Sequence, residues 1–228
     1  MWNTLNLFLI LARSFRRKIL FALHADLTQE LDFIRQVTKE SPKNYQLWQH
    51  RQLILQRLSS PELAEADLEE TKEVLQDDAK NIHCWQYRQW LIEFFQLDRK
   101  GELSFVDALL AEDVYNNSAW NHRAFLFKSE NSDSLDWCFG KLTVETADNE
   151  CCWNYLAALL TDCDKDVYSS VLKRLQSLLG AVEESQNWLF WRFVLIFDRE
   201  RAQEACNKLM HLRPLGHHLW SMMLQNRN

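Results

Sequence analysis

A short motif, asparagine followed four residues later by tryptophan, recurs along the 228-residue chain. Successive copies lie 33 to 38 residues apart, which is the period of a stacked pair of helices and not of a propeller blade or a leucine-rich repeat. The period therefore predicts an all-α fold, a right-handed superhelix (solenoid) of helical hairpin repeats. The copies are Asn44/Trp48, Asn81/Trp85, Asn116/Trp120, Asn149/Trp153 and Asn187/Trp191.

The composition supports a helical chain, because only 4 glycines and 3 prolines occur in 228 residues. So few turn-forming residues leave little material for the connections between many short strands. A repeat array has no closed core, so chain length does not set the number of domains. We expect one helical-repeat domain over residues 1–228, with motifs centred on the five tryptophans and a partial repeat at residues 1–25.

Each repeat is predicted to contain two helices joined by a turn. In the second repeat Leu31, Ile34 and Val37 lie at helical spacing and predict the first helix. Pro42 then ends this helix, and Asn44 follows. Asparagine is a preferred N-cap, because its side-chain oxygen accepts a hydrogen bond from a first-turn N–H group. The motif asparagines are therefore predicted to begin the second helices.

Three of the five copies also carry arginine three residues after the tryptophan. Residues three apart are neighbours on a helix surface, so the arginine is predicted to stack on the indole ring or to pair with the adjoining repeat. The last two copies have Leu156 and Val194 at this position, which is typical of terminal repeats. The complete pairs are Trp48/Arg51, Trp85/Arg88 and Trp120/Arg123.

The charge and hydropathy of the chain exclude some classes of partner. A net charge of −6 argues against nucleic acid, since binding to phosphates needs a basic face. The apolar run Met1–Ala12 is shorter than the roughly 20 residues that cross a bilayer, so no transmembrane segment is predicted. Four basic residues follow within residues 13–18. We expect an apolar helix face here, with an amphipathic helix at a membrane surface as the alternative.

None of the six cysteines forms a Cys-x-x-Cys pair, the spacing that is typical of zinc sites and redox pairs. We therefore predict reduced cysteines that serve in packing, no metal bound by this chain, and a cytoplasmic location. The cysteines are Cys84, Cys138, Cys151, Cys152, Cys163 and Cys206.

Three stretches around the motif, Asn44–Arg51, Asn81–Trp90 and Glu112–Arg123, closely resemble successive repeats of the protein prenyltransferase alpha subunit. The third stretch looks more like the alpha subunit shared by farnesyltransferase and type I geranylgeranyltransferase than like its Rab-specific relative. The resemblance covers approximately residues 13–200 and is weak after about residue 160.

The resemblance implies an alpha-alpha superhelix that wraps a separate beta subunit. The heterodimer would transfer farnesyl or geranylgeranyl from its diphosphate to the cysteine of a C-terminal Cys-a-a-X (CaaX) protein. In the family, zinc is bound by the beta subunit and makes the cysteine thiolate available. Magnesium accompanies farnesyl transfer and is dispensable for geranylgeranyl transfer. In the family, the pocket depth that sets the isoprenoid chain length belongs to the beta subunit, so this sequence indicates neither the isoprenoid nor the protein substrates.

The resemblance also assigns site residues. Lys43 matches the family lysine that contacts the diphosphate, where cationic partners stabilise the charge that builds on the leaving group. Tyr45 matches a tyrosine that lines the active site, and Gln46 matches the glutamine that binds the carboxylate of the peptide. His83 matches a histidine near the diphosphate, but Ile82 replaces the tyrosine that usually precedes it.

Each assignment has a structural alternative. Lys43 would be a solvated loop charge, Tyr45 would pack against the preceding helix, and Gln46 would be exposed to solvent. His83 would be an interface histidine with its hydrogen bonds satisfied. From position in the sequence alone, these structural readings are preferred.

The main departure from the family is at the start of the chain. Arg13 stands where the period places an earlier motif tryptophan, and Phe15, Arg16 and Arg17 continue the pattern in phase. The first half of that repeat is replaced by an apolar run, so we expect an N-terminally shortened form. Two alternatives to the alpha subunit of a CaaX prenyltransferase remain: a non-catalytic helical-repeat scaffold that binds protein, and the alpha subunit of Rab geranylgeranyltransferase.

Overall fold

The computed structural model describes the chain in five stretches: 2–127, 132–143, 145–161, 165–179 and 186–225. Only the backbone is described for residues 2–11, 132, 165, 178 and 179. The apolar side chains of Met1–Ala12 therefore lie outside the described residues, apart from that of Ala12.

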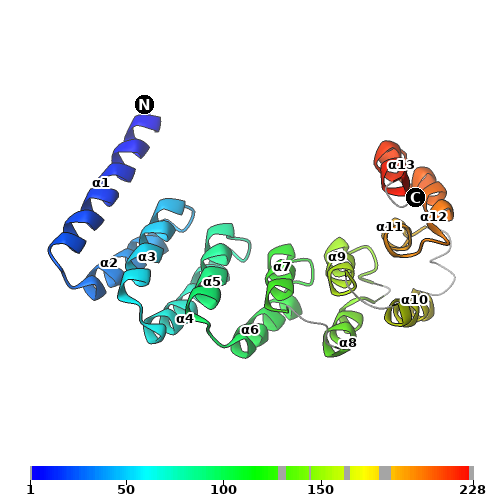
Figure 1. Cartoon of the computed structure of the whole chain (residues 1–228), viewed down its shortest axis with the longest axis horizontal. Coiled ribbons are helices and arrows are strands. Elements are labelled where there is room, and N and C mark those ends of the chain that lie inside the picture. The colour runs from blue at the N-terminus through cyan, green and yellow to red at the C-terminus, as the bar shows by residue number, and fades with distance from the viewer. Residues whose placement is uncertain (1, 128–131, 144, 162–164, 180–185, 226–228) are drawn as a thin grey trace. The chain divides into compact units, whose positions relative to one another are not determined.

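Helices make up the regular structure of the described residues, and no strand is assigned among them (Figure 1). The predicted all-α class is thus confirmed. The elements in chain order are α1 (Trp2–Ala22), α2 (Leu27–Glu40), α3 (Tyr45–Leu58), α4 (Pro61–Asp77), α5 (Ile82–Phe95), α6 (Arg99–Glu112), α7 (Asn117–Leu126), α8 (Ser132–Lys141), α9 (Glu150–Leu159), α10 (Lys165–Leu179), α11 (Trp188–Phe197), α12 (Ala202–Leu212), the 3-10 turn η2 (Pro214–Gly216) and α13 (His217–Gln225).

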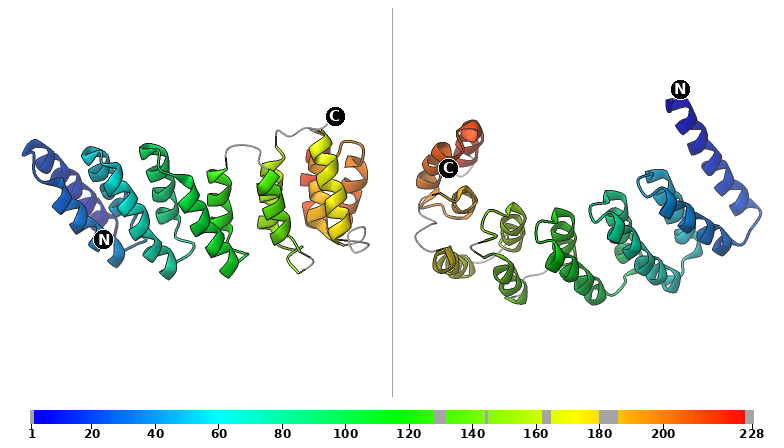
Figure 2. Two further views of the ribbon diagram at one scale, coloured as in Figure 1. Left: turned by 90° about the horizontal axis from the view of Figure 1, so that it is seen from below. Right: turned by 180° about the vertical axis from the view of Figure 1, so that it is seen from behind.

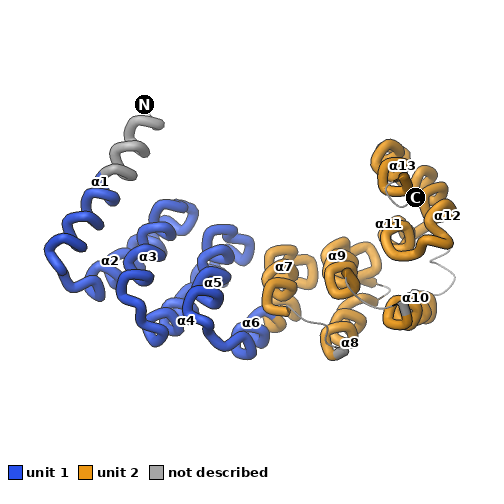
Figure 3. Tube along the Cα trace, viewed as in Figure 1, with its two compact units in different colours: residues 1–106 blue, residues 107–228 orange. Residues whose placement is uncertain are grey.

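The chain divides into two compact units, Met1–Val106 and Asp107–Asn228, coloured blue and orange in Figure 3. In the first unit α2 packs against α3 and α4 packs against α5, and α3 lies beside α5 (Figure 2). In the second unit α8 packs against α9, α9 lies beside α7 and α11, and α11 packs against α12. Helical hairpins are therefore present within each unit. The single domain over residues 1–228 stays a prediction.

The asparagine of every motif copy is the N-cap of a second helix, as predicted. Its backbone is extended, and its side-chain oxygen accepts a hydrogen bond from the first turn of the helix. Asn81 Oδ1, for example, accepts from the N–H groups of His83 and Cys84, both at 3.1 Å. The helices capped in this way are α3, α5, α7, α9 and α11.

In the first four motif copies, a carbonyl oxygen in the preceding turn accepts the indole N–H of the motif tryptophan. Trp48 donates to the carbonyl oxygen of Pro42 at 2.7 Å, and the side-chain amide of Asn81, from the next motif copy, donates to the same oxygen at 3.2 Å. One acceptor therefore joins two consecutive repeats. In the second unit, Trp120 and Asn149 share the oxygen of Val114, and Trp153 and Asn187 share that of Ala147.

Arg51 makes both contacts that the spacing of the motif predicts. The guanidinium of Arg51 lies 5.8 Å from the ring centre of Trp48, and it donates twice to the carboxylate of Asp67, each time at 2.8 Å. Asp67 belongs to α4, so this pair crosses to the adjoining hairpin. Arg88 pairs in the same way with Glu102 of α6, with Nε 2.9 Å from the carboxylate. These charged pairs are buried between hairpins.

Arg123 also joins adjoining helices, but with different partners. It donates to Asp107 of α6 at 2.8 Å and to the hydroxyl of Tyr155, and its guanidinium carbon lies 3.4 Å from the ring centre of Trp137 in α8. An aromatic ring of the following hairpin here takes the place that a carboxylate has beside Arg51 and Arg88.

Polar contacts hold α1 against α2 and α3. Arg16 donates to both carboxylate oxygens of Glu30, with Nε at 2.7 Å. Arg17 Nη1 lies 3.0 Å from His50 Nδ1, and His50 Nε2 lies 2.9 Å from Glu30. A guanidinium can only donate, so Nδ1 must accept and Nε2 must carry the proton. Buried His50 is therefore held as the neutral ring.

We predict that replacing Asn149 separates its two roles. Asn149→Ala removes the cap of α9 and the bond to Val114, and should lower the free energy of unfolding by about 2 kcal/mol. Asn149→Ser keeps a capping oxygen but loses the amide donor, and should cost about half as much. Urea denaturation of both variants measures this, and an unchanged free energy of unfolding for Asn149→Ser would contradict a stabilising bond to Val114.

We also predict that the docking of α1 weakens in acid. Burial lowers the pKa of His50 below its usual value of about 6.5, the charges of Arg17 and Arg13 act in the same direction, and Glu30 opposes them. Stability should therefore be complete above about pH 6.5 and should fall as the pH drops from there through the pKa of folded His50. Each unit by which the pKa is lowered is worth about 1.4 kcal/mol.

The measurement is the urea midpoint between about pH 8 and pH 5 for the natural chain and for His50→Gln. Glutamine can accept from Arg17 and donate to Glu30 without titrating, so the variant reports the contribution of all other groups. Parallel pH profiles of the two proteins would show that His50 does not carry the effect.

Candidate functional site

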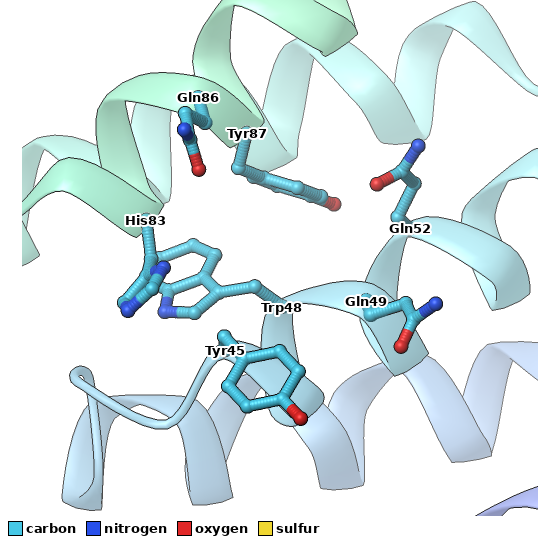
Figure 4. A pocket seen from close by; sticks show the side chains of 7 residues that line it. All are labelled: Tyr45, Trp48, Gln49, Gln52, His83, Gln86 and Tyr87. Atoms are coloured by element: carbon cyan, nitrogen blue, oxygen red, sulfur yellow. The ribbon is translucent and has the colours of Figure 1, made fainter.

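A hollow of about 200 Å³ lies between α3 and α5 in the first unit (Figure 4). Tyr45 and His83 lie at one end and Gln52 lies at the other. None of its lining side chains is a carboxylate, lysine or arginine, so the hollow offers amide, hydroxyl and ring groups. The lining residues are Tyr45, Trp48, Gln49, Gln52, His83, Gln86 and Tyr87.

The structure brings two of the four predicted site residues together. Tyr45 is the first residue of α3 and His83 is the second residue of α5, and their ring centres lie 6.4 Å apart. The caps Asn44 and Asn81 fix these first turns, so the stacking of the two repeats places both rings. Tyr45 is exposed, so packing against the preceding helix is not its only role.

Lys43 does not line the hollow. It lies in the turn between α2 and α3, its side chain is 80% exposed, and its ammonium lies 3.4 Å from a carboxylate oxygen of Asp78. A single contact at this exposure restrains a lysine weakly, so the ammonium can move to another anion. This geometry fits a solvated loop charge. The contact of Lys43 with a diphosphate stays a prediction.

Gln46 also lies outside the hollow. Its side chain is buried, with 8% of the residue exposed, and Oε1 accepts from Arg13 Nη1 at 2.8 Å. The alternative that Gln46 is exposed to solvent is therefore wrong. Its predicted role toward a peptide carboxylate is not tested by this geometry, which shows the amide oxygen engaged with α1.

A buried network supports the wall of the hollow. The rings of Trp48 and Tyr87 lie 5.3 Å apart, and the hydroxyl of Tyr87 donates to the carboxylate of Asp67. Burial alone would raise the pKa of Asp67, but Arg51, Tyr87 and Arg35 together outweigh burial and the pKa is lowered. Burial and the charge of Asp67 raise the pKa of Tyr87, so this hydroxyl keeps its proton and acts as a donor. The wall is structural.

Sequence reasoning missed the amides of the hollow. Gln49 and Gln86 each directly follow a motif tryptophan, and Gln52 lies one helical turn further on from Trp48. Aligning the repeats on their tryptophans would have put the first two at one position of consecutive second helices. That position faces solvent in both helices, because Gln49 and Gln86 are exposed.

Among the described residues, no group of three or more His, Cys, Asp or Glu side chains could hold a metal. No helix in this part of the chain is long and apolar enough to cross a membrane. The predicted packing role of the cysteines is confirmed for Cys84, Cys138, Cys152 and Cys206, which are buried free thiols. Burial raises the pKa of Cys84 and of Cys152 to about 12.

The family model described as "Protein prenyltransferase alpha subunit repeat" matches residues 27–58, 64–95 and 99–130. These matches coincide with three consecutive helical hairpins, from α2 to α7. The solved structure "Candida albicans protein geranylgeranyltransferase-I complexed with GGPP" is similar, with a TM-score of 0.78 and 25% sequence identity. The similarity covers 95% of this chain and 78% of that chain. It confirms the predicted fold class, an alpha-alpha superhelix of helical hairpins.

Two curated relatives carry the same name, "Protein farnesyltransferase/geranylgeranyltransferase type-1 subunit alpha". The protein of Dictyostelium discoideum is 36% identical over 57% of this chain and 54% of its own length. The protein of Pisum sativum is 35% identical over 39% of this chain and 29% of its own length. The chain thus matches about half of the first relative and less than a third of the second.

We predict that the two tyrosines of the hollow differ in what they contribute. Tyr87→Phe removes a buried hydrogen bond to an ionised carboxylate and should lower the free energy of unfolding by about 2 kcal/mol. Tyr45→Phe removes an exposed hydroxyl and should change it by less than about 0.5 kcal/mol. Urea denaturation of both variants gives the comparison, and a large loss for Tyr45→Phe would show that Tyr45 is a structural residue.

Proposed function

The chain belongs to the protein prenyltransferase alpha subunit family, and from this premise we propose that it is the alpha subunit of a heterodimeric protein prenyltransferase. With a beta subunit, it would transfer farnesyl or geranylgeranyl from its diphosphate to the cysteine of a C-terminal CaaX protein. The observation that carries this proposal is that Tyr45 and His83, from two matched repeats, lie together beside an open hollow. A cytoplasmic location belongs to the same proposal.

We propose the following roles for the chain's own residues. Lys43, which precedes Tyr45 and is free to reorient, stabilises the negative charge that develops on the leaving diphosphate. The hydroxyl of Tyr45 and the ring N–H of His83 are hydrogen-bond donors beside it. Gln46 binds the terminal carboxylate of the peptide, and Arg13 orients the side-chain amide of Gln46.

The metals of the reaction are part of the proposal. Zinc, bound by the beta subunit, would supply the cysteine thiolate, and magnesium would accompany farnesyl transfer. This chain would then contribute a positive charge and hydrogen-bond donors to the diphosphate of the isoprenoid.

The second candidate function is a non-catalytic helical-repeat scaffold. It is favoured by Ile82, an exposed apolar side chain where the family pattern has a tyrosine hydroxyl. It is also favoured by Gln46, whose oxygen is already occupied by Arg13. A Rab geranylgeranyltransferase alpha subunit finds no such support, because both relatives named above are type-1 subunits.

The test is co-expression with a farnesyltransferase beta subunit of the same organism, followed by assay of isoprenoid transfer to a CaaX peptide. Lys43→Ala should lower kcat by roughly 100-fold, because one cationic partner of the leaving group is lost. Heterodimer formation should be unchanged, since the side chain is exposed.

Lys80→Ala is the matched control, because Lys80 directly precedes Asn81 as Lys43 precedes Asn44 and is also exposed. It removes the same charge from the equivalent turn and should leave kcat unchanged. Equal effects of the two substitutions would point to general electrostatics and contradict a specific role of Lys43. A stable but inactive natural heterodimer would favour the scaffold.

A further inference from the structure

Two arginines on the face of α1 that packs against α3 have no acidic partner. Arg13 and Arg17 lie one helical turn apart, so they share one side of the helix, and both are half-buried. Arg13 donates to Gln46 Oε1 at 2.8 Å, and Arg17 Nη1 lies 3.0 Å from Nδ1 of the neutral His50 ring. Among the described residues, neither guanidinium forms an ion pair with a carboxylate.

Other arginines of the first unit show how the chain balances such a charge. Arg51 is buried and donates twice to the carboxylate of Asp67, and Arg16 donates to both carboxylate oxygens of Glu30. By contrast, burial lowers the pKa of the two guanidinium groups that lack an acid, and no carboxylate acts against it. Their positive charge is thus partly withdrawn from water without compensation, and an external anion would supply the compensation.

The free hydrogen-bond donors gather beside Gln46. Because Arg13 engages the amide oxygen of Gln46, the NH2 group of this amide is left to donate, and no described residue accepts from it. The charges of Arg13 and Arg17 both act on the neighbouring His50, so the two arginines lie close together. Arg13, Arg17 and the NH2 group of Gln46 therefore form a donor cluster, which suits a carboxylate because a carboxylate only accepts.

The donor cluster lies one repeat before the hollow between α3 and α5. α1 contacts α3 as α3 contacts α5. Counted along the repeats, Arg13 corresponds to Trp48, and Gln46 corresponds to His83. A cation and an amide thus take the places of two rings. The first turn of α3 therefore has Tyr45 and His83 on its α5 side and the donor cluster on its α1 side.

We propose that Arg13 binds the terminal carboxylate of the peptide directly, together with the NH2 group of Gln46. Each group would donate to one carboxylate oxygen, because a planar guanidinium matches a planar carboxylate, and Arg17 would add a second positive charge. The inference rests on the proposed function for the identity of the anion, whereas the donor cluster belongs to this chain alone. Arg13 would then select peptides whose C-terminus is ionised.

The heterodimer tests this with a CaaX peptide and the same peptide ending in a carboxamide. Arg13→Gln should raise KM for the carboxylate peptide about tenfold and change kcat by less than about twofold, because a charge-assisted bond of the bound peptide is lost. KM for the carboxamide peptide should be unchanged, because that peptide has no charge to pair with Arg13. An equal rise for both peptides would show that Arg13 only orients Gln46, since a carboxamide oxygen also accepts from that amide.

Lys18→Gln is the matched control. It removes one positive charge from the same helix, and Lys18 is exposed, with its ammonium 5.7 Å from the ring centre of Phe15. KM for both peptides should be unchanged, and a rise equal to that of Arg13→Gln would overturn the proposal. If urea denaturation shows that Arg13→Gln is unfolded, Arg13→Lys replaces it. Lysine keeps the charge without the planar fork, so KM should rise for the carboxylate peptide alone, by a smaller factor.

A binding measurement on the chain alone separates this inference from the proposed enzymatic function. Acetate is titrated into the isotopically labelled chain, with acetamide as the neutral control, and the arginine side-chain N–H signals are followed by NMR. The Nε–H signal of Arg13 should shift saturably with acetate only, while that of Arg16, already paired with Glu30, should stay in place. This shift in a chain whose heterodimer is inactive would overturn the enzymatic proposal alone. No shift, or equal shifts of Arg13 and Arg16, would overturn carboxylate binding by Arg13.

Discussion

A carbonyl oxygen that accepts two hydrogen bonds joins consecutive repeats of this chain. The oxygen of Pro42 receives the indole N–H of Trp48 from its own repeat and the amide of Asn81 from the next. The same asparagine caps the following helix with its other side-chain atom. Asparagine suits this position because its amide has both a donor and an acceptor, whereas aspartate or serine would cap the helix without donating an amide N–H to the neighbouring turn.

Much of this arrangement follows from the sequence, because its causes are local. The period of the tryptophans predicts helical hairpins, and the preference of asparagine for the N-cap predicts where the second helices begin. The spacing of Trp48 and Arg51 predicts their contact. The sharing of the carbonyl oxygen could not be predicted, because it depends on how far one hairpin is shifted along the next. Period and propensity do not specify that shift.

The candidate site shows the same limit. Resemblance indicated Tyr45 and His83, and the structure places them in one hollow because they follow caps at equivalent positions of adjacent repeats. It also indicated Gln46, but no local rule shows that Arg13, 33 residues earlier, bonds to its side chain. The amides at Gln49 and Gln86 were missed, because residues with no charge and no known motif give no signal until the repeats are superposed.

The position two residues after the motif tryptophan lies on the stacking face of the second helix, and its residue type affects which neighbour can pack there. In α3 it is His50, which bonds to Arg17 and Glu30, and in α5 it is Tyr87, which bonds to Asp67. In these two helices the buried polar group fixes how the hairpin packs on its neighbour, because an unmade bond would cost about 1–3 kcal/mol. In α1 the position is Phe15, which has no polar atom and so imposes no such requirement.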